Sequence, residues 1–280
     1  MNLDSLVLPQ GSVGAGAKLY WHSWLAQGGT RGAVLLVHGY AEHLGRYDHV
    51  AAALTAKGLA VYALDHWGHG KSDGTPGFVP AFSAYTDGVE SLLAKVKAAH
   101  GDVPLFLLGH SMGGLISVLH LIDHQASYAG AILSGPAIVP AEEPSRLTIW
   151  ISRLLSRLAP RLGVIQLDAE GVSRDQKVVA AYRADPLVYT GKIGARLATE
   201  LFEAMARARD GAARVTLPML LLHGSEDSLA APQGSQFIEA HLGSSDKTLK
   251  IYPGLYHEIF NEPEQREVLR DVTDWLEGHL

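Results

Sequence analysis

A serine between glycines is the residue of this chain whose surroundings point most directly to chemistry. Ser111 is the centre of the pentapeptide Gly-His-Ser-Met-Gly at 109–113, which follows the apolar run 103–108 and precedes another at 115–119. This pattern predicts a strand, a sharp turn and a helix, with the serine hydroxyl exposed at the tip of the strand. The glycines allow the strand and the helix to pass each other closely. A chance Gly/Ser turn is the alternative, and the two apolar runs favour the nucleophilic serine over it.

A carboxylate and a histidine suited to activate this serine follow it in the chain. A serine hydroxyl is a weak nucleophile at neutral pH, so it needs a neutral imidazole as base and a carboxylate that orients the imidazole. In a strand–turn–helix setting the order along the chain is serine, carboxylate, histidine. Asp227 follows the apolar run 217–222, and His257 follows the strand pattern 248–252. Both side chains are therefore predicted just beyond strand ends, where catalytic groups collect in open α/β sheets.

Each of these two residues also has an ordinary alternative role. Asp227 would then be a turn residue and His257 a solvated loop residue, and the neighbouring Glu226 is a second candidate for the carboxylate. Their joint occurrence, in the expected order after the serine, favours a catalytic triad of Ser111, Asp227 and His257. We therefore expect nucleophilic catalysis by Ser111.

The same reaction needs two hydrogen-bond donors for the oxyanion that forms when the serine attacks. The backbone N–H of Met112, directly after the serine, is the first expected donor. The second should come from the loop after an earlier strand. The apolar run 33–37 is followed by His38-Gly39-Tyr40, so we expect the Tyr40 N–H to be that donor. A turn that merely ends the strand is the alternative at this position.

An alternation of strands and helices must position these residues. Strands are predicted at 18–26, 33–38, 60–64, 103–108, 129–134, 217–222 and 248–252. Helices are predicted at 47–57, 85–100, 115–124 and 266–280. This alternation indicates a mostly parallel sheet covered by helices on both faces.

One long segment interrupts the alternation. About eighty residues without a core strand separate Pro136 from Val215, far more than a crossover helix needs. We therefore predict an α/β core formed by 1–135 and 216–280, with an inserted cap, or lid, at 136–215 placed over the serine.

Within the predicted cap, 145–163 has the pattern of an amphipathic helix that ends or kinks at Pro160. Its apolar residues exceed one buried stripe, and arginines stand among them. We expect part of this helix to face membrane or lipid aggregates, with the arginines meeting anionic headgroups. A cap helix packed on the core is the alternative.

Composition excludes several classes of protein. The chain has 280 residues, of which 47% are hydrophobic, enough for one domain with an insertion. The net charge is −6 without a block of Lys or Arg, so nucleic acid is not an expected partner. The absence of cysteine excludes disulfides and Cys-based metal sites. His66 and His69 have a spacing that a metal could use, but no further ligands cluster with them, so no metal is predicted.

The sequence also bears on where the protein resides. The N-terminal residues lack the basic and apolar segments of a signal peptide, and no apolar run is long enough to span a bilayer. We expect a cytoplasmic protein with peripheral membrane contact through the cap.

Several motifs give the chain a resemblance to a known family. They are His-Gly-Tyr-Ala-Glu-His at 38–43 with Arg46-Tyr47, Asp-His-Trp-Gly-His-Gly-Lys-Ser-Asp-Gly at 65–74, the serine motif at 109–114, and the stretches 185–188 and 246–252. Over nearly the whole chain they resemble the monoacylglycerol lipase family of the serine α/β-hydrolase superfamily. The resemblance implies an α/β-hydrolase fold, with a mostly parallel central sheet, helices on both faces and an inserted helical cap.

The resemblance also implies an activity and its residues. The family cleaves the ester bond of a monoacylglycerol, a lipid-like substrate, to fatty acid and glycerol through an acyl-enzyme, without a metal or organic cofactor. Residue by residue, the triad falls on Ser111, Asp227 and His257, and the oxyanion donors fall on the Tyr40 and Met112 amides. Contacts to the glycerol end fall on Arg46, Tyr182 and Glu143, with Glu142 as the alternative to Glu143.

The chain departs from the family pattern at two positions. Tyr40 stands where the family often has a small residue, and we expect it to narrow or gate the acyl entrance. Phe260 stands where some members have a second histidine, which removes a polar group near the leaving alcohol. Because the fold does not fix the substrate, a lysophospholipase and a carboxylesterase for short- to medium-chain esters remain alternatives. A non-catalytic binding protein of the same fold is a third.

Overall fold

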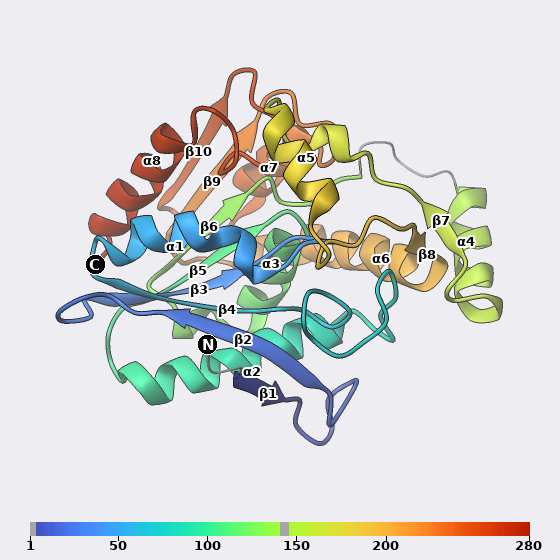
Figure 1. The fold of residues 1–280 in the computed structure, drawn as a ribbon, viewed down its shortest axis with the longest axis horizontal. Helices are drawn as coiled ribbons and strands as arrows, with labels where there is room; N and C mark the ends of the chain where they lie inside the picture. The colour runs from blue at the N-terminus through green and yellow to red at the C-terminus, as the bar shows by residue number, and fades with distance from the viewer. Residues whose placement is uncertain (1–3, 141–145) are drawn as a thin grey trace.

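The centre of the molecule is an eight-stranded sheet with the strand order β1-β2-β4-β3-β5-β6-β9-β10 (Figure 1). The computed structural model describes residues 4–140 and 146–280. The strands are β1 (Asp4–Val7), β2 (Lys18–Trp24), β3 (Gly32–Val37), β4 (Leu59–Leu64), β5 (Leu105–His110), β6 (Gly130–Ser134), β9 (Met219–Gly224) and β10 (Lys247–Tyr252). β2 pairs antiparallel with β1 and with β4, and the remaining pairs are parallel. The predicted fold class is thus confirmed.

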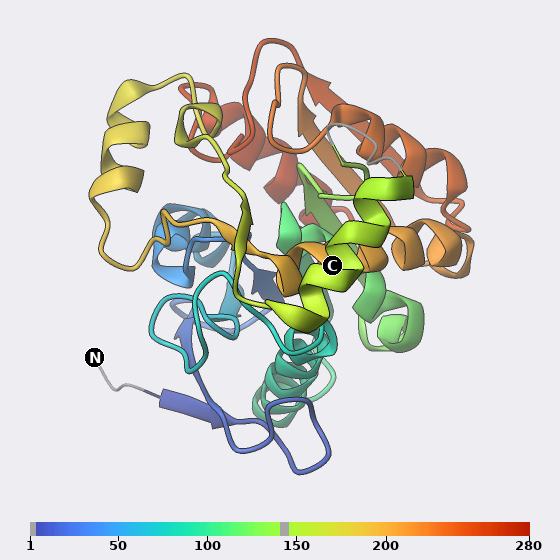
Figure 2. The ribbon, with the colours of Figure 1, turned by 90° about the vertical axis from the view of Figure 1, so that its right-hand side faces the viewer.

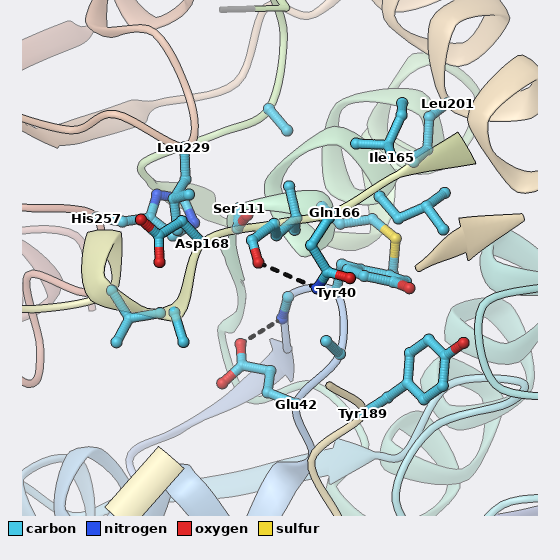
Figure 3. Close-up of a pocket in the computed structure, with 18 of the residues that line it drawn as sticks. Tyr40, Glu42, Ser111, Ile165, Gln166, Asp168, Tyr189, Leu201, Leu229 and His257 are labelled. Atoms are coloured by element: carbon cyan, nitrogen blue, oxygen red, sulfur yellow. Dashed lines mark hydrogen bonds between the residues drawn. The ribbon is translucent and has the colours of Figure 1, made fainter. Parts of the chain in front are cut away.

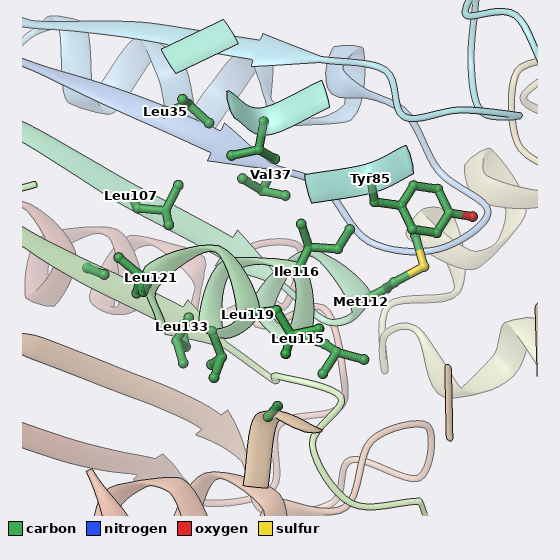
Figure 4. Packing of buried hydrophobic residues seen from close by; sticks show 14 of the residues in the cluster. Leu35, Val37, Tyr85, Leu107, Met112, Leu115, Ile116, Leu119, Leu121 and Leu133 are labelled. Carbon is green, nitrogen blue, oxygen red and sulfur yellow. The ribbon is translucent and has the colours of Figure 1, made fainter. Parts of the chain in front are cut away.

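Helices cover both faces of this sheet. One face packs against α2 (Ser83–His100), α3 (Met112–His124) and α7 (Pro232–His241), and the other packs against α1 (Asp48–Thr55) and α8 (Gln265–Glu277). Successive residues of β3 alternate between the two cores, with Leu35 on the α3 side and Val34 on the α8 side. Figure 4 shows the first core, where Leu35 and Leu107 of the sheet face Ile116 of α3. Burial on both faces explains why the central strands are continuous apolar runs.

The chain between β6 and β9 forms elements outside the sheet, and we call 136–215 the inserted segment. Its elements are α4 (Arg146–Leu158), β7 (Gly163–Ile165), α5 (Gln176–Ala184), β8 (Ile193–Gly194) and α6 (Ala195–Gly211). α6 packs on α3 through buried alanines, while α4 packs on α6 farther from the sheet (Figure 2). Among the described helices, none is both long and apolar enough to cross a membrane.

The structure shifts two element boundaries at the serine. β5 continues to His110 where the prediction ends it at 108, and α3 begins at Met112 where the prediction begins it at 115. Gly113 and Gly114 lie in the first turn of α3, where tertiary packing outweighs the low helix preference of glycine. Strand, serine and helix therefore follow one another with no residue between them.

Candidate active site

Ser111 stands on a strained turn between β5 and α3. Its backbone has φ 54° and ψ −119°, a conformation that L-residues rarely adopt and that costs about 1–3 kcal/mol. A Cβ on Gly113 would lie 2.0 Å from the Val37 carbonyl oxygen, so this position requires glycine. The Ser111 N–H donates to the Ser134 carbonyl at 2.9 Å, and the Ser111 carbonyl accepts from the Ala137 N–H at 3.0 Å. The turn is thereby fixed to the end of β6.

Asp227 and His257 meet beyond the adjacent carboxyl ends of β9 and β10. His257 Nδ1 lies 2.6 Å from Asp227 Oδ2, and both side chains are buried. A Cβ on Gly224 would lie 2.3 Å from the Leu255 carbonyl oxygen, so glycine lets the loop that carries His257 approach the end of β9. Glu226, the alternative carboxylate, is exposed and its side chain contacts Ser225. The structure therefore places Asp227 against the histidine and Glu226 away from it.

Every oxygen of the Asp227 carboxylate has hydrogen-bond donors. Oδ1 accepts the backbone N–H groups of Leu229 and Ala230, each at 2.9 Å, and Oδ2 also accepts from His223 Nε2 at 3.0 Å. Burial alone would raise the pKa of Asp227, but the charge of His257 and the hydrogen bonds hold it far below its ordinary value. Asp227 is thus a permanent anion beside the imidazole.

The His257 imidazole is set up to accept a proton at its second nitrogen. Burial opposes the charged form, but the charge and hydrogen bond of Asp227, with smaller contributions from Glu258 and Glu42, raise the pKa of His257. Because Nδ1 donates to Asp227, we assign the free lone pair to Nε2. His257 and Ser111 line the same cavity (Figure 3). No hydrogen bond joins them among the described residues, as is common before a substrate is bound.

The two amides expected to bind an oxyanion lie beside the serine. Tyr40 and Met112 both line the cavity, and neither backbone N–H donates to an acceptor in the described part of the chain. The loop before Tyr40 is held by a 2.6 Å hydrogen bond from the Gly39 N–H to Glu42, which is marked in Figure 3. Ala41 has a positive φ of 68°, which turns the chain sharply after Tyr40. Two unpaired backbone donors beside a serine are the groups that an oxyanion hole needs, and their role as that site stays a prediction.

The cavity above Ser111 is large and mostly apolar. Its volume is about 840 Å³, within the range of binding sites for small molecules. Its apolar wall comes from the inserted segment and the loop after β9, through Ile165, Leu167, Val172, Ile193, Leu201, Phe202, Met205 and Leu229. The Tyr40 ring stands edge-on to the Tyr189 ring across this wall. Such a wall suits an extended hydrocarbon chain.

Tyr182 and Arg46, two of the residues expected at the polar end of the cavity, have different surroundings. Tyr182 lines the cavity as expected, but Arg46 is absent from the described lining residues. Its guanidinium binds Glu258 with both terminal nitrogens at 2.6 Å and Glu42 at 2.8 Å, and its side chain is 11% exposed. Two carboxylates thus hold the guanidinium, and the direct contact of Arg46 with glycerol stays a prediction. Glu143 and its alternative Glu142 lie outside the described residues.

Sequence reasoning missed Glu258, which lines the cavity next to His257. It is buried, and Asn261 Nδ2 donates to it at 2.9 Å. A charged residue directly after the expected base was a signal that could have found it. Phe260, by contrast, is buried in the core below α1 and is not among the described lining residues. The polar group that the structure places beside His257 is thus the carboxylate of Glu258.

His66 and His69 lie behind the oxyanion loop. His66 Nε2 donates to the His38 carbonyl at 3.2 Å, and His69 Nδ1 donates to the Trp67 carbonyl at 2.9 Å. Within residues 4–140 and 146–280, no group of three or more potential ligands suited to a metal ion was found.

Comparison with known proteins supports the family. A family model described as serine aminopeptidase, S33, matches residues 28–264. The chain is 43% identical to a monoacylglycerol lipase of Mycolicibacterium smegmatis, over 95% of each chain. The structure is similar to that of Paleococcus ferrophilus monoacylglycerol lipase, with a TM-score of 0.85 and 33% identity over 94% of this chain and 99% of that one. It is also similar to a soluble variant of monoglyceride lipase from Saccharomyces cerevisiae in complex with a substrate analog, with a TM-score of 0.85 and 28% identity over 99% and 94%. The chain therefore belongs to the monoacylglycerol lipase family of the serine α/β-hydrolases.

Proposed function

We propose that the protein hydrolyses monoacylglycerols to a fatty acid and glycerol through an acyl-enzyme. The observation that carries this proposal is the arrangement of the cavity. A serine, a histidine paired with a buried aspartate and two free amides lie at the junction of an apolar wall and a polar end. An acyl chain fits the first part and a hydroxyl-bearing alcohol fits the second. The names of the relatives agree with this assignment.

The geometry accounts for each step of such a reaction. His257 Nε2 takes the proton of Ser111 as its oxygen attacks the ester carbonyl, and Asp227 stabilises the imidazolium that forms. The amides of Tyr40 and Met112 receive the oxyanion. The imidazolium then protonates the departing alcohol, and a water molecule repeats the sequence on the acyl-serine.

We propose in addition that the inserted segment, 136–215, is the cap of the enzyme and rests on lipid surfaces. Its large apolar side chains that are exposed, among those the structure describes, are Ile151, Leu154, Leu158, Leu162, Val164 and Leu167. Leu158 is 75% exposed, and the exposed Leu167 also lines the cavity. Arg153, Arg157 and Arg161 lie along the same stretch. An apolar surface that carries cations and adjoins the apolar wall of the cavity suits a lipid layer as its partner. This proposal agrees with a cytoplasmic enzyme that contacts membranes peripherally.

The activity is tested by glycerol release from 1-monooleoylglycerol, with Ser111→Ala as the inactive control. Rates on lysophosphatidylcholine and on a short-chain p-nitrophenyl ester, measured in parallel, distinguish the lysophospholipase and carboxylesterase alternatives. The proposal requires kcat/KM to be greatest for the monoacylglycerol. Labelling of Ser111 by a fluorophosphonate together with no turnover of any of the three esters would refute it.

A further inference from the structure

The polar end of the cavity holds an excess of negative charge. Arg46 is a single cation between two carboxylates, Glu42 and Glu258, and all three side chains are nearly buried, with exposures of 11%, 5% and 6%. One positive and two negative charges leave a net charge of −1. Glu42 and Glu258 are among the described residues that line the cavity, and Arg46 is not.

The contacts of Arg46 leave it poorly placed to bind an anion. Both of its terminal nitrogens donate to carboxylates, and the Tyr182 ring covers the guanidinium at 4.7 Å. The other charged groups near the cavity do not reverse the balance. Asp168 is an exposed anion of the wall, and Arg183 is paired with Glu170 at 2.7 Å.

Two consequences follow for a leaving alcohol at this end. Carboxylate oxygens accept hydrogen bonds from hydroxyl groups, so an uncharged polyol gains partners there. A phosphate on the same alcohol meets like charge in a partly dehydrated site, and the described lining residues offer it no unpaired Lys or Arg. Discrimination therefore arises from repulsion of one substrate as well as attraction of the other.

We propose that Glu258 is a specificity-determining residue, which together with Glu42 selects esters of an uncharged polyol and excludes esters whose alcohol carries a phosphate. This inference rests on the proposed hydrolysis of monoacylglycerols. Glu42 is less suited to a test because it also holds the Gly39 N–H and the Tyr47 hydroxyl, at 2.6 and 2.7 Å. Among the described residues, Glu258 makes no direct hydrogen bond to the loop before Tyr40.

The test compares two substrates that differ by one phosphate. We would measure kcat/KM for 1-monooleoylglycerol and for 1-oleoyl lysophosphatidic acid in the same mixed micelles. The variants are Glu258→Gln, which removes the charge, and Glu258→Asp, which keeps it. Glu277→Gln is the matched control, since Glu277 pairs on the surface with Arg31 and Lys57, each at 3.5 Å.

The wild type and Glu277→Gln should strongly prefer the uncharged substrate. Glu258→Gln should reduce that preference by about tenfold or more, because like-charge repulsion across a partly buried site has at least this size. Glu258→Asp should keep most of the preference. A role of Glu258 in folding alone would lower both rates equally, so the ratio is the decisive readout.

Three outcomes overturn the proposal. An unchanged ratio in a folded Glu258→Gln variant, checked by thermal melting, refutes the role of Glu258 while leaving the hydrolase activity intact. Equal wild-type kcat/KM for the two substrates refutes the exclusion of phosphate even where Glu258→Gln does not fold. Failure of the wild type on both substrates refutes the proposed function itself, and the inference with it.

Discussion

Replacing Asp227 by asparagine should disable the base without removing the side chain that positions it. The Oδ1 position faces the backbone N–H groups of Leu229 and Ala230, which can only donate, so the asparagine oxygen must stay there. Its NH2 group then takes the position of Oδ2 and points at Nδ1 of His257. In the wild type, Oδ2 of Asp227 and Nδ1 of His257 are 2.6 Å apart. His257 must accept at Nδ1, which moves its proton to Nε2.

An imidazole protonated at Nε2 cannot take the proton of Ser111. We expect Asp227→Asn to lower kcat by about 10⁴-fold, equivalent to about 5 kcal/mol of lost transition-state stabilisation. His223 keeps an acceptor for its own Nε2 proton in the Ala230 carbonyl at 2.9 Å, so the fold should survive. The expected loss of kcat therefore comes from the move of one proton from Nδ1 to Nε2 of His257.

The assay is initial-rate glycerol release from 1-monooleoylglycerol, with melting temperature as a check on folding. Glu226→Gln is the matched control, because the adjacent carboxylate is exposed and lies away from the histidine. It should keep wild-type activity to within a factor of about two, as expected of a surface change far from the reacting atoms. An Asp227→Asn variant within about tenfold of wild type, or an equal loss in Glu226→Gln, would refute the tautomer argument.

Three further predictions use other parts of the molecule. The acid limb of kcat/KM should have its midpoint above 6.5, since His257 accepts a proton only when neutral and its pKa is raised above that ordinary value; a midpoint below 6.5 would contradict the assignment. Leu158→Asp should weaken flotation with anionic liposomes. Leu25→Asp, which changes an exposed leucine in the loop after β2, is the control and should not weaken it. Equal flotation of the two variants would exclude docking through the inserted segment. Arg46→Ala should lower the free energy of unfolding by about 3–5 kcal/mol, because two buried carboxylates lose their counterion; a loss under about 1 kcal/mol in urea denaturation would contradict this.

The sequence predicted the sheet and the neighbourhood of the site for a physical reason. The carboxyl ends of parallel strands lie at one edge of the sheet. Residues just past apolar runs, such as Ser111, Asp227 and His257, therefore converge even when they are far apart along the chain. Their catalytic roles stay predictions until the variants are assayed. The local patterns were weaker where packing decides, as at the start of α3, where the approach of β3 requires glycine at 113.

The polar end of the cavity depends on a contact that no local pattern reveals. Arg46 and Glu258 are 212 positions apart and meet only because the chain after β10 returns to the loop after β3. Sequence spacing carries no information about such a pair, so Arg46 was expected to be free for glycerol. A buried ion pair can thus hold in place a cation that the local sequence presents as free.

The fastening of Ser111 to the end of β6 limits how the entrance can open. The peptide groups of the serine are tied to Ser134 and Ala137, which begin the very stretch of chain that leads out to α4. If the inserted segment moves, its hinge has to lie beyond Ala137. Bending of the chain between Ser134 and Ala137 would also displace Ser111, which is hydrogen-bonded to both residues. Substitutions at 134–136 would therefore alter turnover although these residues are not among the described residues that line the cavity.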